Sequence, residues 1–165
     1  MIKQITVIAF FLFASIVGSA QISKRPAYEA MLQGLLDHNV PELQVSQVIE
    51  MEGFIFLDSR SKEEYDVSHI PGAIWVGYDK FELDKVEYLD KDKVLIVYCS
   101  VGYRSEKVAK QIYDSGNKNV ANLYGGIFQW VDEDGIVEDK NGPTVRVHAY
   151  DEAWGVWLRK GKKVY

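Results

Sequence analysis

The chain has 165 residues, of which 47% are hydrophobic, 13% aromatic and 26% charged, and its formal net charge is −5. This composition is typical of a globular protein and excludes a disordered or collagenous chain. The absence of a Lys/Arg block argues against a nucleic-acid-binding protein. The single cysteine excludes both an intramolecular disulfide and an all-cysteine metal site.

The first twenty residues have the three-part pattern of a secretory signal peptide. Lys3 supplies a positive charge, residues 5–17 form an uncharged and mostly apolar run, and residues 18–20 are small. A membrane anchor is the alternative, but the run is shorter than the roughly 18 residues that suggest a spanning helix. The residue directly after Ala20 is Gln21 and not a cysteine, so a lipoprotein anchor is not expected. We expect cleavage after Ala20 and export to a bacterial periplasm or cell exterior, with no stable membrane anchor after cleavage.

Short helical patterns alternate with short apolar runs along the rest of the chain. The first half predicts a helix over 27–36, a short strand at Val45, a helix capped by Ser46 to about Met51, a strand over 54–57, a helix opened by a capping box at 61–64, and a strand over 73–76. The second half predicts a helix over 81–89, a strand over 94–98, a helix over 106–115 capped by Ser105, a strand over 120–124 and a helix over 127–131. This alternation predicts an α/β fold with a parallel sheet and helices on both faces.

The pattern weakens after Asp134. Residues 135–143 are predicted as a loop and 144–147 as a strand, whereas the aromatic and basic tail to Tyr165 stays unassigned. The tail contains Trp154 and Trp157, which could form a partner-binding patch. Packing over a sheet edge is the commoner role for such residues.

Cys99 directly follows the most apolar predicted strand, at the carboxyl end where α/β sheets bind ligands. Successive N–H groups of the loop after it can form an anion nest, and the following helix adds the positive end of its dipole. Arg104 adds a permanent cation, and Gly102 allows a positive φ. The alternative is a buried structural cysteine that acts as a small hydrophobe. The order strand, Cys, Gly, Arg, helix favours a nucleophilic thiolate instead.

Three motifs in this chain together point to one protein family. The loop Cys99-Ser100-Val101-Gly102-Tyr103-Arg104-Ser105 resembles the active loop of the rhodanese family, Cys-x-x-Gly-x-Arg-Ser. The segments Asp58-Ser59-Arg60, Glu63-Glu64-Tyr65 and His69-Ile70-Pro71-Gly72-Ala73 resemble a second family block, with Ser68 where glycine is usual. The segment Tyr124-Gly125-Gly126 with Trp130 resembles the Gly-Gly…Trp segment after the last strand. The motifs occur in the family's order and cover about residues 45–131.

The resemblance implies a rhodanese-like α/β fold with about five parallel strands and a sulfurtransferase activity. The Cys99 thiolate would attack the sulfane sulfur of a small anionic donor such as thiosulfate, carry it as a persulfide, and pass it to cyanide, a thiol or a protein sulfur acceptor. Loop residues Ser100, Val101, Gly102, Tyr103 and Arg104 would hold the persulfide, and Arg104 would either bind substrate or brace the loop. The chemistry requires no cofactor and no metal. The implied division is a signal peptide (1–20), an N-terminal helical segment (21–40), a rhodanese-like domain (41–135) and a C-terminal extension (136–165).

Two other functions are compatible with the same loop. The first is a noncatalytic rhodanese-like module that binds a protein or an anion, although the retained cysteine and complete loop favour catalysis. The second is a cysteine-dependent phosphatase or arsenate reductase. Such enzymes place five residues between the cysteine and the arginine, whereas this chain places four, residues 100–103. The shorter loop favours sulfur chemistry over phosphoryl or arsenate chemistry.

Each of the remaining polar candidates could have a structural role instead of a functional one. Asp58 and Ser105 could support the loop, although Asp58 is as well suited to a capping or turn role. Arg60 and Glu64 could form a local ion pair. His69 could be a general base, but fixing its turn is the more plausible role. The other two histidines, His38 and His148, have no partner pattern for a metal site.

Overall fold

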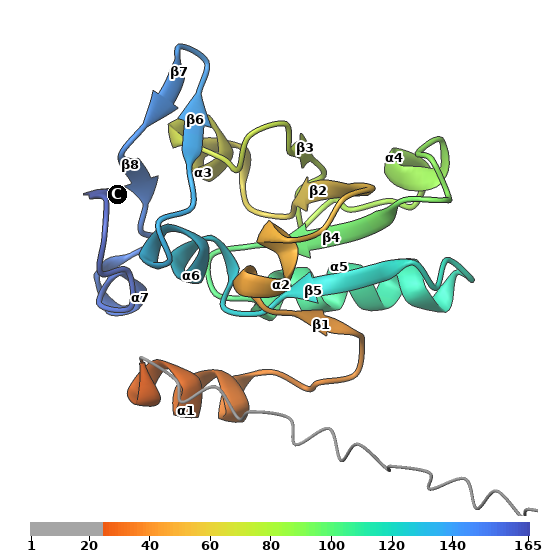
Figure 1. Ribbon diagram of the computed structural model, residues 1–165, viewed down its shortest axis with the longest axis horizontal. Coiled ribbons are helices and arrows are strands. Elements are labelled where there is room, and N and C mark those ends of the chain that lie inside the picture. The colour runs from red at the N-terminus through yellow and green to blue at the C-terminus, as the bar shows by residue number, and fades with distance from the viewer. Residues whose placement is uncertain (1–24) are drawn as a thin grey trace, which may run out of the picture.

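The computed structural model describes residues 25–165, and its core is a five-stranded parallel sheet in the order β1-β5-β4-β2-β3 (Figure 1). The strands are β1 (Glu42–Leu43), β2 (Phe54–Asp58), β3 (Ile74–Trp75), β4 (Val94–Tyr98) and β5 (Val120–Leu123). The predicted parallel α/β fold is therefore confirmed. The predicted signal peptide, residues 1–20, and the start of the 21–40 segment lie outside the described residues.

The central strand β4 is covered on both faces, as its uninterrupted apolar sequence predicts. Leu95 and Val97 belong to one hydrophobic cluster, and Ile96 and Tyr98 belong to the other. Successive side chains of a strand point to opposite faces, so β4 divides the core into two layers. Its register with β2 places Tyr98 beside Asp58 at the carboxyl ends of both strands.

Seven helices are described within residues 25–165. They are α1 (Pro26–Leu35), α2 (Val45–Ile49), α3 (Lys62–Val67), α4 (Asp84–Glu87), α5 (Tyr103–Asp114), α6 (Gly126–Asp132) and α7 (Glu152–Gly155). Buried residues of α1, α2 and α6 share the cluster on one face of the sheet, and those of α4 and α5 share the other. The prediction of helices on both faces is confirmed. No helix within residues 25–165 is long and apolar enough to cross a membrane.

Two predicted helix starts are wrong, each for a local reason. Val45 begins α2 rather than forming a strand, because Gln44 and Gln47 make a reciprocal capping box there. Helix α5 begins at Tyr103 with Gly102 as its N-cap, three residues before the predicted start. The Ser105 hydroxyl bonds the Gly102 carbonyl and Asn122 instead of capping the helix.

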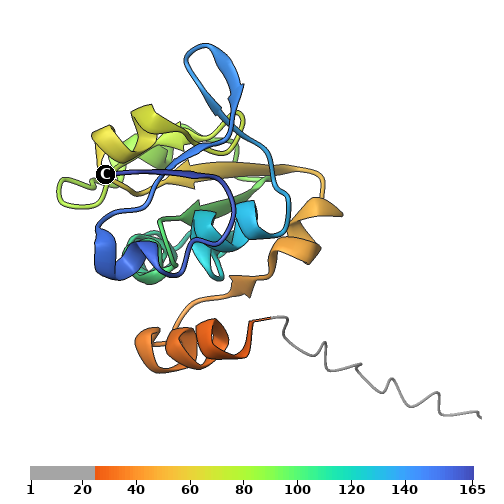
Figure 2. The same ribbon diagram turned by 90° about the vertical axis from the view of Figure 1, so that its left-hand side faces the viewer.

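The C-terminal segment, residues 136–165, packs against the rest of the protein. It contains β6 (Val137–Asp139), β7 (Gly142–Thr144), β8 (Arg146–His148) and β9 (Lys162–Val164), with β6 and β7 antiparallel and β8 and β9 parallel. The predicted strand over 144–147 is interrupted at Val145, which is 70% exposed. Both views place the β6–β7 hairpin and α1 at opposite ends of the molecule (Figures 1 and 2).

Residues of the C-terminal segment belong to the main hydrophobic cluster. Val147, Ala149 and Leu158 are all buried there. Ser68, the position where glycine is usual, donates its hydroxyl to the Arg146 carbonyl at 2.6 Å. This serine therefore ties the end of α3 to β8.

Candidate functional site

Cys99 lies at the carboxyl end of β4 and is 1% exposed. Its Sγ accepts a hydrogen bond from the backbone N–H of Gly102 at 3.2 Å. The amides of Ser100, Val101 and Tyr103 donate to no acceptor within residues 25–165. They belong to the loop and the first turn of α5, where N–H groups have no intrahelical partner. Within the described residues, the loop therefore leaves three backbone N–H groups without an acceptor.

The first turn of α6 holds the two peptide carbonyls at the start of this loop. Ile127 N–H donates to the Cys99 carbonyl at 2.9 Å, and Phe128 N–H donates to the Ser100 carbonyl at 3.1 Å. This close approach requires Gly126, because a Cβ there would lie 2.4 Å from the Cys99 carbonyl oxygen. The Gly-Gly motif at 125–126 thus permits direct backbone contact between α6 and the cysteine.

Three buried side chains fix the other end of the loop and the glycine turn. Ser105 Oγ donates to Asn122 Oδ1 at 2.7 Å, and Asn122 Nδ2 donates to the Gly102 carbonyl at 3.1 Å. Tyr28 of α1 donates its hydroxyl to the Gly125 carbonyl at 2.8 Å. Gly102 itself has φ +114, a conformation that L side chains rarely adopt. Ser105 therefore supports the loop by bonding the Gly102 carbonyl and Asn122.

The Glu64 side chain of α3 binds two side chains of the Cys99 loop, Ser100 and Arg104. Both terminal nitrogens of Arg104 donate to the Glu64 carboxylate at 2.7 Å, and Ser100 Oγ donates to the same carboxylate at 3.0 Å. Burial alone would raise the pKa of Glu64, but the hydrogen bonds and charge of Arg104 outweigh burial and lower it to about 2. The partner charge also raises the pKa of Arg104, against the opposing effect of burial. Arg104 thus connects the loop to α3 through Glu64 and contacts Ser100 within the loop.

The local ion pair expected between Arg60 and Glu64 does not form. Arg60 is fully buried and pairs with Asp58, with Nη2 at 2.6 Å from Oδ2, and it also donates to the Ser68 carbonyl. Glu64 is held by Arg104, 40 residues further along the chain, because α3 lies beneath the Cys99 loop. The Asp58 carboxylate accepts hydrogen bonds from the backbone N–H and the guanidinium of Arg60. It therefore holds Arg60, and the described residues show no hydrogen bond from the Cys99 loop to it.

Cys99 opens into a cavity of about 560 Å³. Its lining residues come from the cysteine loop, from the segments after β2 and β3, and from the C-terminal segment: Ser61, Glu64, Tyr78, Asp79, Cys99, Ser100, Val101, Tyr103, Arg104, His148, Tyr150 and Trp154. Five of these side chains carry aromatic rings, namely Tyr78, Tyr103, His148, Tyr150 and Trp154. The cavity thus places five aromatic side chains around the opening to Cys99.

The structure brings together most of the loop residues singled out in the sequence. Ser100, Val101, Tyr103 and Arg104 line the cavity with Cys99, whereas Gly102 and Ser105 support it from behind. His69 lies outside the lining: its ring stacks on Tyr65 at 3.9 Å, and its backbone pairs with Glu138. These contacts are those of a turn residue.

Sequence reasoning missed the contributions of Asn122, Gly126 and the C-terminal segment. In the sequence Trp154 is one of two tail tryptophans with no assigned position, but in the structure it lines the cavity, whereas Trp157 packs on Tyr28 with ring centroids 5.5 Å apart. His148 lines the cavity without any metal-ligand cluster around it within residues 25–165. The aromatic content of the tail was the one signal for this segment, and it suggested a partner-binding patch or packing over a sheet edge rather than a wall of the cavity.

Comparison with known proteins agrees with this geometry. The sequence profile of the Rhodanese family, a rhodanese-like domain, matches residues 43–133 of this chain. The chain is similar to the tRNA uridine(34) hydroxylase of Yersinia pestis (strain Pestoides F), with 34% identity over 101 residues. That match covers 58% of this chain and 28% of the hydroxylase, so the chain spans less than a third of the length of the curated relatives it matches.

Two solved structures are also similar. The BH2092 protein of Bacillus halodurans is 31% identical, with a TM-score of 0.55 over 73% of this chain and 89% of that protein. The thiosulfate sulfurtransferase of Pseudomonas aeruginosa is 25% identical, with a TM-score of 0.58 over 79% of this chain and 26% of that enzyme. The rhodanese motifs of the sequence and the observed fold therefore agree.

Proposed function

This chain belongs to the rhodanese-like domain family, and on that premise we propose that it is a sulfurtransferase in which Cys99 carries the sulfur. The observation that carries the proposal is the Cys99 Sγ beside an amide donor, at a cavity large enough for a sulfur donor or acceptor. The likeness to the Pseudomonas aeruginosa thiosulfate sulfurtransferase supports the same reaction class.

The proposed reaction is a double displacement at one sulfur atom. The Cys99 thiolate attacks the outer sulfur of thiosulfate, a sulfur–sulfur bond forms, and the donor's sulfur–sulfur bond breaks to release sulfite. The persulfide carries its negative charge on the outer sulfur, next to the free loop amides. Cyanide or a thiolate then attacks that outer sulfur, and Cys99 leaves as the thiolate. No oxidant or reductant is needed, because the sulfane sulfur moves between nucleophiles.

The loop geometry favours sulfur transfer over phosphoryl transfer. Four residues separate Cys99 from Arg104, one fewer than in cysteine-dependent phosphatases. Both terminal nitrogens of Arg104 contact Glu64, so the guanidinium is engaged by a carboxylate rather than held for a phosphate. A bidentate Arg–phosphate contact would require this pair to break.

Intact-mass measurement after incubation with thiosulfate tests the proposal. We expect wild-type protein to gain the mass of one sulfur atom and to lose it again on addition of cyanide, with thiocyanate as the product. The Cys99→Ser variant should gain nothing, because Cys99 is the only cysteine. Circular dichroism of both proteins provides the control for folding.

If wild-type Cys99 can be alkylated but gains no sulfur from thiosulfate or from polysulfide, the proposal is wrong. That result would favour the noncatalytic binding module. Hydrolysis of a phosphate ester that depends on Cys99 would instead favour the phosphatase alternative.

We also propose that the protein acts outside the cytoplasm, because its first twenty residues have the pattern of a secretory signal peptide. Expression of the full chain in a bacterium should give a mature protein that starts at Gln21 and is released with the periplasmic or secreted fraction. N-terminal sequencing of that protein checks the cleavage point. Recovery of the uncut chain in the cytoplasm would contradict the export proposal.

A further inference from the structure

The C-terminal segment supplies a wall of the Cys99 cavity that lies beyond the family match. His148 ends β8, Tyr150 follows it, and Trp154 lies in α7, and all three line the cavity. The rhodanese-like match ends at residue 133. These side chains therefore lie outside the region that the family profile matches.

The wall is built into the fold. Tyr150 has φ +69, a left-handed conformation that residues other than glycine rarely adopt. Its N–H donates to His148 Nδ1 at 3.1 Å, and the Arg104 guanidinium lies 5.1 Å from its ring centroid. Asp151 caps α7 by accepting from the Trp154 N–H at 2.8 Å. Tyr150 is thus held beside the loop despite its backbone strain.

The size of the cavity points to an organic ligand. Its volume of about 560 Å³ falls in the range of sites that bind drug-sized molecules, roughly 300–1,000 Å³. A small inorganic anion would leave most of this volume to water. Tyr103 and Tyr150 are 41% and 47% exposed, so apolar ring surface remains available to a ligand.

The side-chain charges around the cavity offer no partner to an anionic group carried by an organic acceptor. The charged lining residues are Glu64, Asp79 and Arg104, two carboxylates and one guanidinium. Arg104 is already paired with Glu64 at 2.7 Å. The loop amides are available to thiosulfate and to the persulfide, but a carboxylate elsewhere on an acceptor would meet no uncompensated side-chain cation in the lining and would be repelled by Asp79.

We propose that this aromatic wall, His148, Tyr150 and Trp154, binds the sulfur acceptor, and that the acceptor is a small organic thiol with an apolar group and no negative charge. The inference rests on the proposed function and deepens it. The thiol loses its proton to solvent, and its thiolate attacks the outer sulfur of the Cys99 persulfide. The bond between the two persulfide sulfurs breaks, the acceptor leaves as the new persulfide, and Cys99 returns to the thiolate.

The test uses two matched acceptors on the full chain loaded with sulfur. Phenylmethanethiol and 4-(mercaptomethyl)benzoate present the same benzylic thiol and differ by one carboxylate. Wild-type persulfide, followed by intact mass, should discharge to phenylmethanethiol at least tenfold faster than to the benzoate. Discharge to cyanide serves as the reference, because cyanide is too small to need the wall.

Two variants test whether the aromatic wall causes the preference for phenylmethanethiol. Tyr150→Gly removes the ring and also relieves the left-handed strain, so it should fold at least as well as the wild type. We expect Tyr150→Gly, and independently Trp154→Ala, to lower the rate of discharge to phenylmethanethiol about tenfold relative to the rate of discharge to cyanide by the same variant. An aromatic side chain in contact with the acceptor would account for this loss, which corresponds to about 1.4 kcal/mol.

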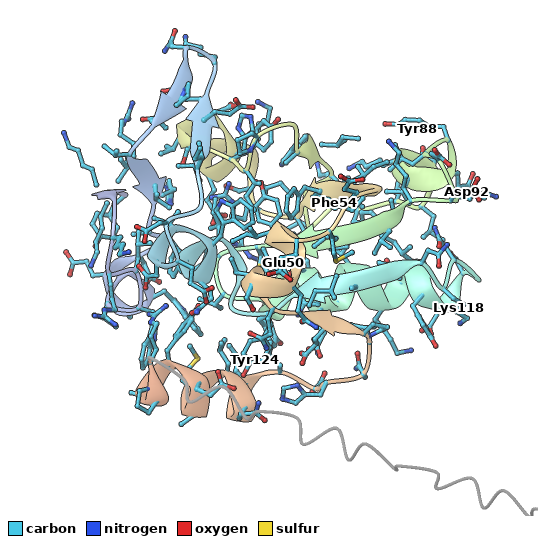
Figure 3. All side chains as sticks on the ribbon, viewed as in Figure 1. Glu50, Phe54, Tyr88, Asp92, Lys118 and Tyr124 are labelled. Carbon is cyan, nitrogen blue, oxygen red and sulfur yellow. The ribbon has the colours of Figure 1, made fainter. Side chains whose placement is uncertain are left out.

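Tyr88→Ala is the matched control, because Tyr88 is an exposed tyrosine outside the cavity lining. Figure 3 shows it near α4, at the end of the molecule away from α7. Its discharge rates should equal those of the wild type. Equal rates for both benzylic thiols, or unchanged rates in both wall variants, would overturn the inference.

A second readout separates this inference from the proposed function. Benzyl alcohol has no thiol and should protect the single cysteine of the wild type from alkylation by iodoacetamide. Protection should weaken in Tyr150→Gly and in Trp154→Ala. Protection without any persulfide formation would retain the aromatic site and remove the sulfurtransferase proposal. Persulfide formation without protection and without an acceptor preference would support the sulfurtransferase proposal and would overturn the aromatic acceptor site.

Discussion

Replacing Gly126 by alanine is expected to lower the free energy of unfolding by about 3 kcal/mol and to displace Cys99. The new Cβ would lie 2.4 Å from the Cys99 carbonyl oxygen and 2.7 Å from the Ser100 carbonyl carbon. Both contacts are with backbone atoms, so no side-chain rotation relieves them. The variant must lengthen the two hydrogen bonds from α6 that hold this loop.

Gly53→Ala separates the steric contact from the cost of a positive φ. Gly53 has φ +72 and Gly126 has φ +57, but a Cβ at Gly53 would meet nothing within 4 Å. The Gly53 variant should therefore lose only the conformational part, roughly 1–2 kcal/mol. Urea unfolding measures both stabilities, and the rate of Cys99 alkylation reports the loop geometry. Equal stability losses in the two variants would show that α6 does not pack on the loop as described.

Glu64→Gln is expected to destabilise the protein by about 3 kcal/mol at pH 7. The Glu64 carboxylate accepts from Arg104, from Ser100 and from the Ser61 N–H at 3.0 Å, and its side chain is 3% exposed. An amide offers one acceptor oxygen where the carboxylate offers two. Its NH₂ group would face one of these donors, and the Arg104 charge would lose its partner.

The same pair predicts how stability depends on pH. The pKa of Glu64 falls from the ordinary 4.5 to about 2, since Arg104 outweighs the opposing effect of burial. A lowered pKa in the folded state stabilises the protein fully above pH 4.5, and this contribution is lost as the pH falls from 4.5 towards 2. The stability difference between wild type and Glu64→Gln should therefore shrink over that interval.

Glu52→Gln is the matched control for this effect. Glu52 is an exposed glutamate in the turn before β2, away from the Glu64–Arg104 pair. Its replacement should leave the urea midpoint close to that of the wild type at pH 7 and at pH 3. A constant difference between wild type and Glu64→Gln from pH 7 to pH 3 would contradict the proposed ion pair.

Local patterns in the sequence were sufficient for much of the fold. The apolar run 94–98 predicts a strand covered on both faces, and the Ser61–Glu64 capping box predicts the start of α3. Each signal depends on neighbouring residues, so it can be interpreted without knowing the tertiary contacts. The catalytic role of Cys99 stays a prediction until sulfur transfer is measured.

The sequence by itself determined the parallel α/β fold and the loop that follows the Cys99 strand, because strand hydrophobicity and glycine positions act over a few residues. Only the tertiary structure decided that Glu64 pairs with Arg104 instead of Arg60, and that Gly126 touches the Cys99 carbonyl. It also decided that Tyr150 lines the cavity. These contacts join residues far apart in the chain, and their partners are selected by the packing of α3, α6 and the C-terminal segment around the loop.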